Sequence, residues 1–166
     1  MSYEFMLIGA VLTIFTGSIV FLVGQFTLAL VLNPMQEFRK AIGEASYILL
    51  RHQAKLNNPF SDDDKKIDKG KDASIRKDIA GELKSISAKL LSTSNTIFGY
   101  SLLLEKFFGL PIKSDICEAA RELNGLSQSM NPEDFCTFGL YTADKNWESM
   151  VKIGKILKIQ TTYSGY

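Results

Sequence analysis

The side chains best suited to nucleophilic catalysis in this chain are those of His52, Cys117 and Cys136. A serine or cysteine nucleophile needs a neighbouring base and a third group that orients the base. His52 falls on the apolar spacing of its predicted helix, which favours a hydrogen-bonded structural histidine, and neither cysteine belongs to a known active-site motif. We therefore expect no enzyme, and we interpret both cysteines as small, reduced core residues.

Two pairs of carboxylates, Glu118 with Glu122 and Glu133 with Asp134, also have ordinary explanations. The first pair has the spacing of neighbours on an exposed helix face, and the second lies in a first turn, where the helix dipole favours acids. The acidic segment Ser61–Asp72 lacks the glycine that the calcium loop of an EF-hand requires. With one histidine and no C-x-x-C pair, a zinc site is not expected either, and we predict no metal and no cofactor.

Basic residues cluster near the end of the chain, at Lys145, Lys152, Lys155 and Lys158. On a helix with an apolar face, such residues can contact anionic lipid or a phosphate-bearing ligand. The alternative is the solvated face of a packed helix. Nucleic acid is not an expected partner, because acidic and basic residues alternate throughout the chain and no reading motif is present.

The segment Phe5–Leu32 contains no charged side chain. At about 1.5 Å per helical residue it reaches about 42 Å, whereas the hydrocarbon core of a bilayer is about 30 Å thick. It is too long for the apolar core of a secretory signal, and no basic residue precedes it. We predict a transmembrane anchor over residues 1–33.

The distribution of charge predicts the orientation of this anchor. All 19 Lys and Arg residues lie at or beyond Arg39, and Glu4 alone is charged before the apolar segment. Because cytoplasmic flanks carry the excess of basic residues, we expect a single-pass protein with its N-terminus outside and residues 34–166 in the cytoplasm.

Small residues recur along one side of the apolar segment, at Gly9, Thr13, Gly17 and Gly24. Such a stripe allows another helix to approach closely, and the amide of Gln25 would gain a partner there. The pattern favours a homo-oligomer or contact with another membrane protein. A lipid-facing helix with incidental glycines is the alternative.

The rest of the chain has the three- and four-residue apolar spacing of helices, and no pair of segments has the alternation of a β-hairpin. The Asn33-Pro34 pair is typical of a helix start, with or without a kink after the anchor. We predict an all-α domain of about five or six helices, a mobile charged loop at 58–72 and a frayed tail from Gln160. The predicted helices cover residues 34–57, 72–91 (with a start at 72 or 74), 97–108, 114–130, 133–141 and 145–159.

The apolar positions of these helices predict one shared hydrophobic core. Its first two helices are expected to pair antiparallel, and the helix that starts at Pro34 has the most regular stripe. The predicted core residues are Met35, Phe38, Ile42, Ala45, Leu49, His52, Leu56, Ile75, Ile79, Leu83, Ile86, Leu90, Ile116, Ala119 or Ala120, Leu123, Leu126, Met130, Trp147, Met150, Val151, Gly154 and Leu157.

Two helical segments, Phe38–Leu50 (FRKAIGEASYILL) and Ile116–Met130 (ICEAARELNGLSQSM), resemble a set of small bacterial single-span membrane proteins with a cytoplasmic helical domain. The resemblance implies the bacterial inner membrane as the location. It carries over no active or binding residue.

Two functions are compatible with these patterns. The first is a membrane-anchored, non-enzymatic helical protein that acts as a scaffold, adaptor or sensor for a partner protein. The alternative is a ligand-gated membrane effector, in which the cytoplasmic domain binds a phosphorylated small molecule and the spans perturb the membrane. Membrane lipid is an expected contact in both.

Overall fold

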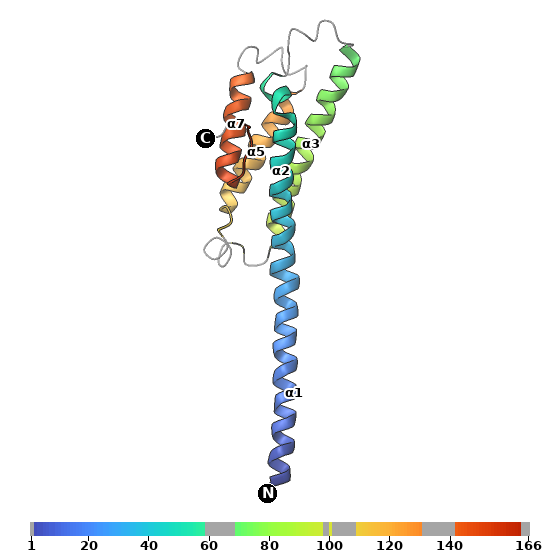
Figure 1. Cartoon of the computed structure of the whole chain (residues 1–166), viewed down its shortest axis with the longest axis vertical. Coiled ribbons are helices and arrows are strands. Elements are labelled where there is room, and N and C mark those ends of the chain that lie inside the picture. The colour runs from blue at the N-terminus through green and yellow to red at the C-terminus, as the bar shows by residue number, and fades with distance from the viewer. Residues whose placement is uncertain (1, 59–68, 98–99, 101–108, 131–141, 164–166) are drawn as a thin grey trace.

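The computed structural model describes residues 2–58, 69–97, 100, 109–130 and 142–163, and every regular element in this part of the chain is helical (Figure 1). The predicted all-α fold is therefore confirmed there. One uninterrupted helix opens the chain and has three parts: α1 (Ser2–Thr27), the π-helical stretch η1 (Leu28–Leu32) and α2 (Asn33–Asn57). The remaining helices are α3 (Lys69–Thr96), α5 (Lys113–Ser129) and α7 (Thr142–Leu157).

The helices α2, α3, α5 and α7 form a four-helix bundle in which successive helices alternate in direction (Figure 1). Each packs mainly against two neighbours: α2 and α5 both contact α3 and α7. The predicted antiparallel pairing of the first two bundle helices is thus correct. The further helices predicted at 97–108 and 133–141 lie almost wholly outside the described residues.

The junction between α1 and the bundle is helical because a π turn accommodates Pro34. Proline lacks the N–H that would bond to the carbonyl four residues earlier, and its ring collides with that carbonyl in an α-helix. Immediately before Pro34, the Asn33 N–H donates instead to the carbonyl of Leu28, five residues earlier. This widened turn moves the obstructing carbonyl aside, so that the helix continues.

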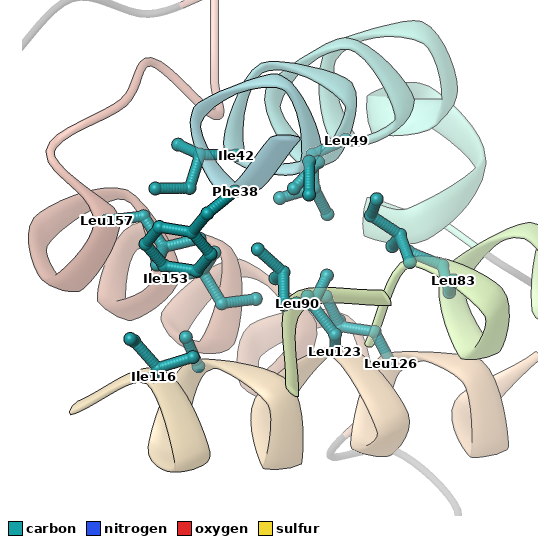
Figure 2. Packing of buried hydrophobic residues seen from close by; sticks show 14 of the residues in the cluster. Phe38, Ile42, Leu49, Leu83, Leu90, Ile116, Leu123, Leu126, Ile153 and Leu157 are labelled. Carbon is teal, nitrogen blue, oxygen red and sulfur yellow. The ribbon is translucent and has the colours of Figure 1, made fainter. Parts of the chain in front are cut away.

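The core lies between the four helices, where one apolar stripe of each points inward (Figure 2). The ring of Phe38 is fully buried and makes an edge-to-face contact with Tyr100, with 6.1 Å between the ring centroids. Most predicted core positions are confirmed. Those buried as expected are Met35, Phe38, Ile42, Ala45, Leu49, Leu56, Ile79, Leu83, Ile86, Leu90, Ile116, Ala119, Ala120, Leu123, Leu126, Met130, Met150, Gly154 and Leu157.

The helices α3 and α5 approach each other through small residues that exchange hydrogen bonds. The Ser87 hydroxyl donates to the Ala120 carbonyl at 2.8 Å, and the Ser127 hydroxyl donates to the Ala80 carbonyl at 2.9 Å. Each hydroxyl thereby has a hydrogen-bond partner inside the interface. A buried hydroxyl without a partner would lower the stability of the fold.

The helix α3 begins earlier than the sequence indicated. Residues from Lys69 onward, assigned to the charged loop at 58–72, already belong to this helix. Asp72 is buried there, bonded to Lys55 at 2.8 Å and also to Arg76. The ion pairs make burial of this acid possible, and the one with Lys55 of α2 joins two helices, which local composition does not reveal. The rest of the predicted loop, 59–68, lies outside the described residues.

The segment after α7 is ordered as far as Tyr163, contrary to the expected fraying from Gln160. Thr161 is buried, and its hydroxyl donates to the Met150 carbonyl at 2.8 Å. The Ser46 hydroxyl of α2 donates to the carbonyl of Gln160. Threonine hydroxyls paired with helix carbonyls can be buried at low cost, which is why a polar tail packs between α2 and α7.

Three other side chains expected in the core lie at the surface. Ile75, in the first turns of α3, is 41% exposed, although Asp72 one turn before it is buried. Trp147 is 36% exposed, since the buried face of α7 passes through the neighbouring Asn146 instead. Cys117 is exposed on α5, and Cys136 lies outside the described residues. Val151 is only partly buried.

Candidate functional site

The helix α1 exposes its apolar side chains on all sides. Every residue from Tyr3 to Leu30 is exposed, and the first side chains to pack against the core are Val31 and Leu32, which are half-buried. This helix is long and apolar enough to cross a membrane, and none of its most apolar window is buried inside the protein. The predicted apolar span is thus a helix whose apolar surface is not covered by the part of the chain that the structure describes.

The small residues of α1 leave open space along the helix. A Cβ added at Gly9, Gly17 or Gly24 would meet no other atom within 4 Å. The hydroxyl of Thr13 donates to the Gly9 carbonyl at 2.9 Å, so its polar group is satisfied inside the helix. The amide of Gln25 is exposed and has no hydrogen-bond partner among the described residues. These five predicted interface residues therefore remain available to a second helix.

The four lysines predicted to contact lipid or phosphate do not form one surface. Lys145 and Lys158 lie at opposite ends of α7, about 20 Å apart along the helix at 1.5 Å per residue. Lys152 lies between them and contacts two acids of α5, with 2.7 Å from its Nζ to Glu118 Oε1 and to Glu122 Oε1. These ion pairs of Lys152 therefore connect α7 to α5.

The environment of Glu122 favours its ionised form. Partial burial alone would raise the pKa of this carboxyl, but hydrogen bonds from Lys152 and Ser149 outweigh burial and hold the pKa below its ordinary value of 4.5. In return, the hydrogen bonds with Glu118 and then Glu122 raise the pKa of Lys152. Each charge stabilises its partner, which is the expected effect of opposite charges at short distance.

A shallow recess of about 320 Å³ lies on the outer surface of α7. Its described lining consists of Trp147, Glu148, Val151, Lys152 and Lys155. An indole beside an ammonium group can contact an aromatic or phosphate-bearing molecule, and Lys155 forms no ion pair with a described residue. Sequence reasoning found the lysines of this recess but assigned Trp147 to the core.

A second shallow groove, of about 400 Å³, lies outside the seam between α2 and α3. The absent side chain of Gly81 leaves room in it, and an ion pair between Glu44 and Lys89, 2.6 Å long, crosses it. His52 lies further along the same seam, where its Nε2 is 3.0 Å from Glu82 Oε2. This hydrogen bond gives the histidine the structural role expected from its place on the apolar stripe.

The potential nucleophile and base do not meet in the described structure. His52 bonds to Glu82 in the seam between α2 and α3, whereas Cys117 is on the exposed side of α5. No group of three or more His, Cys, Asp or Glu side chains in the described ranges is placed to hold a metal ion.

The end of the bundle from which α1 extends carries exposed residues that sequence reasoning did not group. They come from two helices, α2 and α5, and from the segments just before α5 and just after α7. These residues are Arg39 and Lys40 of α2, Ile112 and Lys113 at the start of α5, and Lys158 after α7. Only the folded bundle brings them to one end, because they are distant in sequence. We call this set the proximal surface.

Comparison of the chain with protein-family models, with curated proteins and with solved structures finds no match in any of the three.

Proposed function

We propose that this chain is a single-span protein of the bacterial inner membrane that holds a cytoplasmic helical bundle at the bilayer and acts, without catalysis, as a scaffold, adaptor or sensor for a partner protein. The observation that carries the proposal is the exposure of every apolar side chain of α1. A surface of this size and composition is unfavourable in water and favourable in lipid.

The continuity of the helix from α1 to α2 supports a role as a scaffold, adaptor or sensor. Because α1, η1 and α2 form one helix, a displacement of the span is transmitted directly to the bundle core through Phe38 and Leu49. A flexible linker would not transmit it. The arrangement suits a protein that presents its bundle in a defined orientation.

Extraction of membranes with alkaline carbonate tests the anchor. The wild-type chain should stay in the pellet, whereas Val20→Lys should shift a substantial fraction to the supernatant, because a central lysine costs about 2.5 to 3.5 kcal/mol on insertion. Tyr47→Lys, on the exposed face of α2, is the matched control and should behave like wild type. Recovery of the wild-type chain in the supernatant would refute the proposal.

The orientation has its own test. A protease site or tag after Tyr166 should be protected in intact cells and accessible in inverted vesicles. Labelling of this tag from outside intact cells would overturn the cytoplasmic placement.

Assembly within the membrane is tested by crosslinking. If Gly17 and Gly24 lie in a helix interface, Gly17→Leu and Gly24→Leu should weaken crosslinks of the chain to itself or to its membrane partner. Substitution of Phe15, a large exposed residue of α1, by leucine is the control. Crosslinking that is unchanged in both glycine variants would count against this interface.

The recess beside Trp147 favours the second candidate, a membrane effector gated by a phosphorylated small molecule. Trp147 is the sole tryptophan, so its fluorescence reports on this recess directly. Saturable quenching by a nucleotide that is lost in Lys155→Ala, together with a nucleotide-dependent change in membrane permeability, would support the effector. Absence of both effects for all candidate nucleotides would leave the scaffold, adaptor or sensor role.

A further inference from the structure

The proximal surface carries four exposed cations and an exposed isoleucine. It lies at the end where α1 leaves the bundle, where α5 begins and α7 ends (Figure 1). Internal contacts place its members at one level. Phe38, next to Arg39, contacts the ring of Tyr100, whose hydroxyl donates to the Pro111 carbonyl at 2.7 Å. Ile112 and Lys113 follow directly.

The bundle begins where the exposed apolar surface of the first helix ends. Leu30 is still exposed, whereas Val31 and Leu32 already pack against the core. No spacer therefore separates the apolar helix from the bundle. If α1 spans a bilayer, its apolar part lies in the hydrocarbon core. The proximal surface, which follows directly, then lies at the level of the phospholipid headgroups.

Helix direction determines which cations extend toward this boundary. Side chains tilt toward the N-terminus of their helix, and α2 and α5 both start at the proximal end. Arg39, Lys40 and Lys113 therefore extend toward the bilayer. On α7, which runs in the opposite direction, Lys152 and Lys155 tilt away from it.

The charge balance of this end is positive in the described residues. Its acids are Glu37 on the first turns of α2 and, on the first two turns of α5, Asp115 and Glu118, the second of which pairs with Lys152. They do not cancel the four cations. Lys158 lies beyond the last turn of α7, and its Nζ is 3.4 Å from the Gly109 carbonyl, a long and exposed contact that leaves the ammonium accessible to solvent.

We propose that the proximal surface docks on the anionic phospholipid headgroups of the leaflet that α1 enters, with Ile112 inserted among them, so that the bundle stands upright on the membrane. This inference rests on the proposed membrane anchor. Exposed cations near an anionic leaflet gain about 1 kcal/mol each, equivalent to about a fivefold change in population. In this orientation Lys113 and Lys158 contact the headgroups, whereas Lys145, at the other end of the bundle, does not.

Quenching of a fluorophore on Cys117 by headgroup nitroxide lipid tests the docking, because Cys117 is exposed close to Lys113. The full chain, with Cys136→Ser to leave one thiol, is reconstituted in vesicles of phosphatidylcholine with or without phosphatidylglycerol. Strong quenching is expected only with phosphatidylglycerol, and high salt should remove it. Trp147, on the distal half of α7, should stay unquenched by the same lipid.

Substitutions identify the residues responsible. Each of Lys113→Ala and Lys158→Ala should lower the ratio of docked to undocked bundle about fivefold, whereas Lys77→Ala, an exposed lysine of α3 near the other end, should not. Equal quenching in both lipid mixtures, quenching of Trp147, or no effect of the two substitutions would overturn the inference. Loss of the wild-type chain from floated vesicles would instead refute the membrane anchor itself.

Discussion

Lys152 and Glu122 form an ion pair that connects α7 to α5, with 2.7 Å between Nζ and Oε1. The Ser149 hydroxyl adds a hydrogen bond to the other carboxylate oxygen of Glu122 at 2.8 Å. Two residues of α7, one turn apart, therefore hold one acid of α5. Lys152, one of the four lysines predicted to contact lipid or phosphate, therefore connects two helices of the bundle.

The lowered pKa of Glu122 predicts a specific acid sensitivity. A carboxyl whose pKa is depressed by folding stabilises the folded state above its unfolded pKa, and this contribution is lost as the pH falls through the lower, folded pKa. In thermal unfolding of the full chain in detergent, Glu122→Gln should be less stable than wild type near neutral pH. The difference should be about 1 kcal/mol or less, because solvent screens the pair, and it should vanish in acid.

The matched control for this prediction is Glu118→Gln, which removes the other acid that contacts Lys152. The side chain of Glu118 is more exposed than that of Glu122, at 44% against 23%. Its substitution should therefore lower the unfolding free energy less at neutral pH than Glu122→Gln does. A difference between Glu122→Gln and wild type that persists unchanged into acid would contradict the assignment.

The backbone of Lys158 predicts a stabilising substitution. This residue has a φ of 56°, in the left-handed region, and the following Ile159 N–H donates to the Gly154 carbonyl at 3.0 Å. These are the features of a Schellman cap, whose left-handed position favours glycine. Lys158→Gly should raise the free energy of unfolding by up to about 1 kcal/mol, measured by denaturant titration.

Lys155→Gly is the control for this cap, because Lys155 is inside α7. A glycine there should destabilise the chain by about 1 kcal/mol. A loss of stability in Lys158→Gly similar to that in Lys155→Gly would contradict the proposed strain at the cap.

The buried hydroxyl of Tyr100 predicts a cost for its removal. Tyr100→Phe keeps the ring contact with Phe38 but leaves the buried Pro111 carbonyl without its 2.7 Å hydrogen bond. A loss of about 1 to 2 kcal/mol is expected in the unfolding free energy. Tyr47→Phe, at a tyrosine that is 62% exposed, should change it little. Equal effects of the two substitutions would contradict this role for the hydroxyl.

The regular apolar spacing of α2, α3 and α5 was sufficient to predict most of the core. In these helices a stripe such as Leu83, Ile86 and Leu90 has one clear face, and the structure buries all three. In α7 the apolar residues cover a wider arc, so spacing alone could not decide between Trp147 and Asn146. The structure buries Asn146, whose amide donates to the Leu56 carbonyl at 2.7 Å and caps the end of α2.

The features that the sequence did not reveal depend on contacts between distant segments. The tail at Thr161 is polar and follows the last helix, and it is held by hydrogen bonds to α7, through the Met150 carbonyl, and to α2, through Ser46. Likewise, the proximal surface combines Arg39, Lys113 and Lys158, which come to the same end of the bundle only when it folds. Spacing along one helix contains no information on such groups.

The exchanged hydrogen bonds between α3 and α5 predict two independent losses. Ser87→Ala and Ser127→Ala each remove a donor to a carbonyl of the facing helix, so each should lower the unfolding free energy by about 1 kcal/mol. The double variant should show a nearly additive loss, because each serine bonds to a different residue. Ser85→Ala, at an exposed position of α3, is the control. Unchanged stability in both single variants would show that these bonds contribute nothing.

The dependence of η1 on Pro34 predicts a rotation of α1 relative to the bundle. In Pro34→Ala the new N–H can donate to the Leu30 carbonyl, so the π turn can relax to an α turn. The difference in winding would turn α1 by about a quarter turn about its axis. Spin labels at Gly24→Cys and Cys117, with Cys136→Ser, should report this rotation as an altered distance in the full chain.

Pro111→Ala is the control for this rotation, because Pro111 lies in the segment before α5 and not in the continuous helix. It should leave the distance between the two labels unchanged. The same distance in Pro34→Ala and wild type would show that packing of Val31 and Leu32 against the core, rather than the missing proline N–H, maintains the π turn.

A rotation of α1 relative to the bundle would also turn the open face of Gly17 and Gly24 to a new direction. Crosslinking through that face should then weaken in Pro34→Ala even though both glycines are intact.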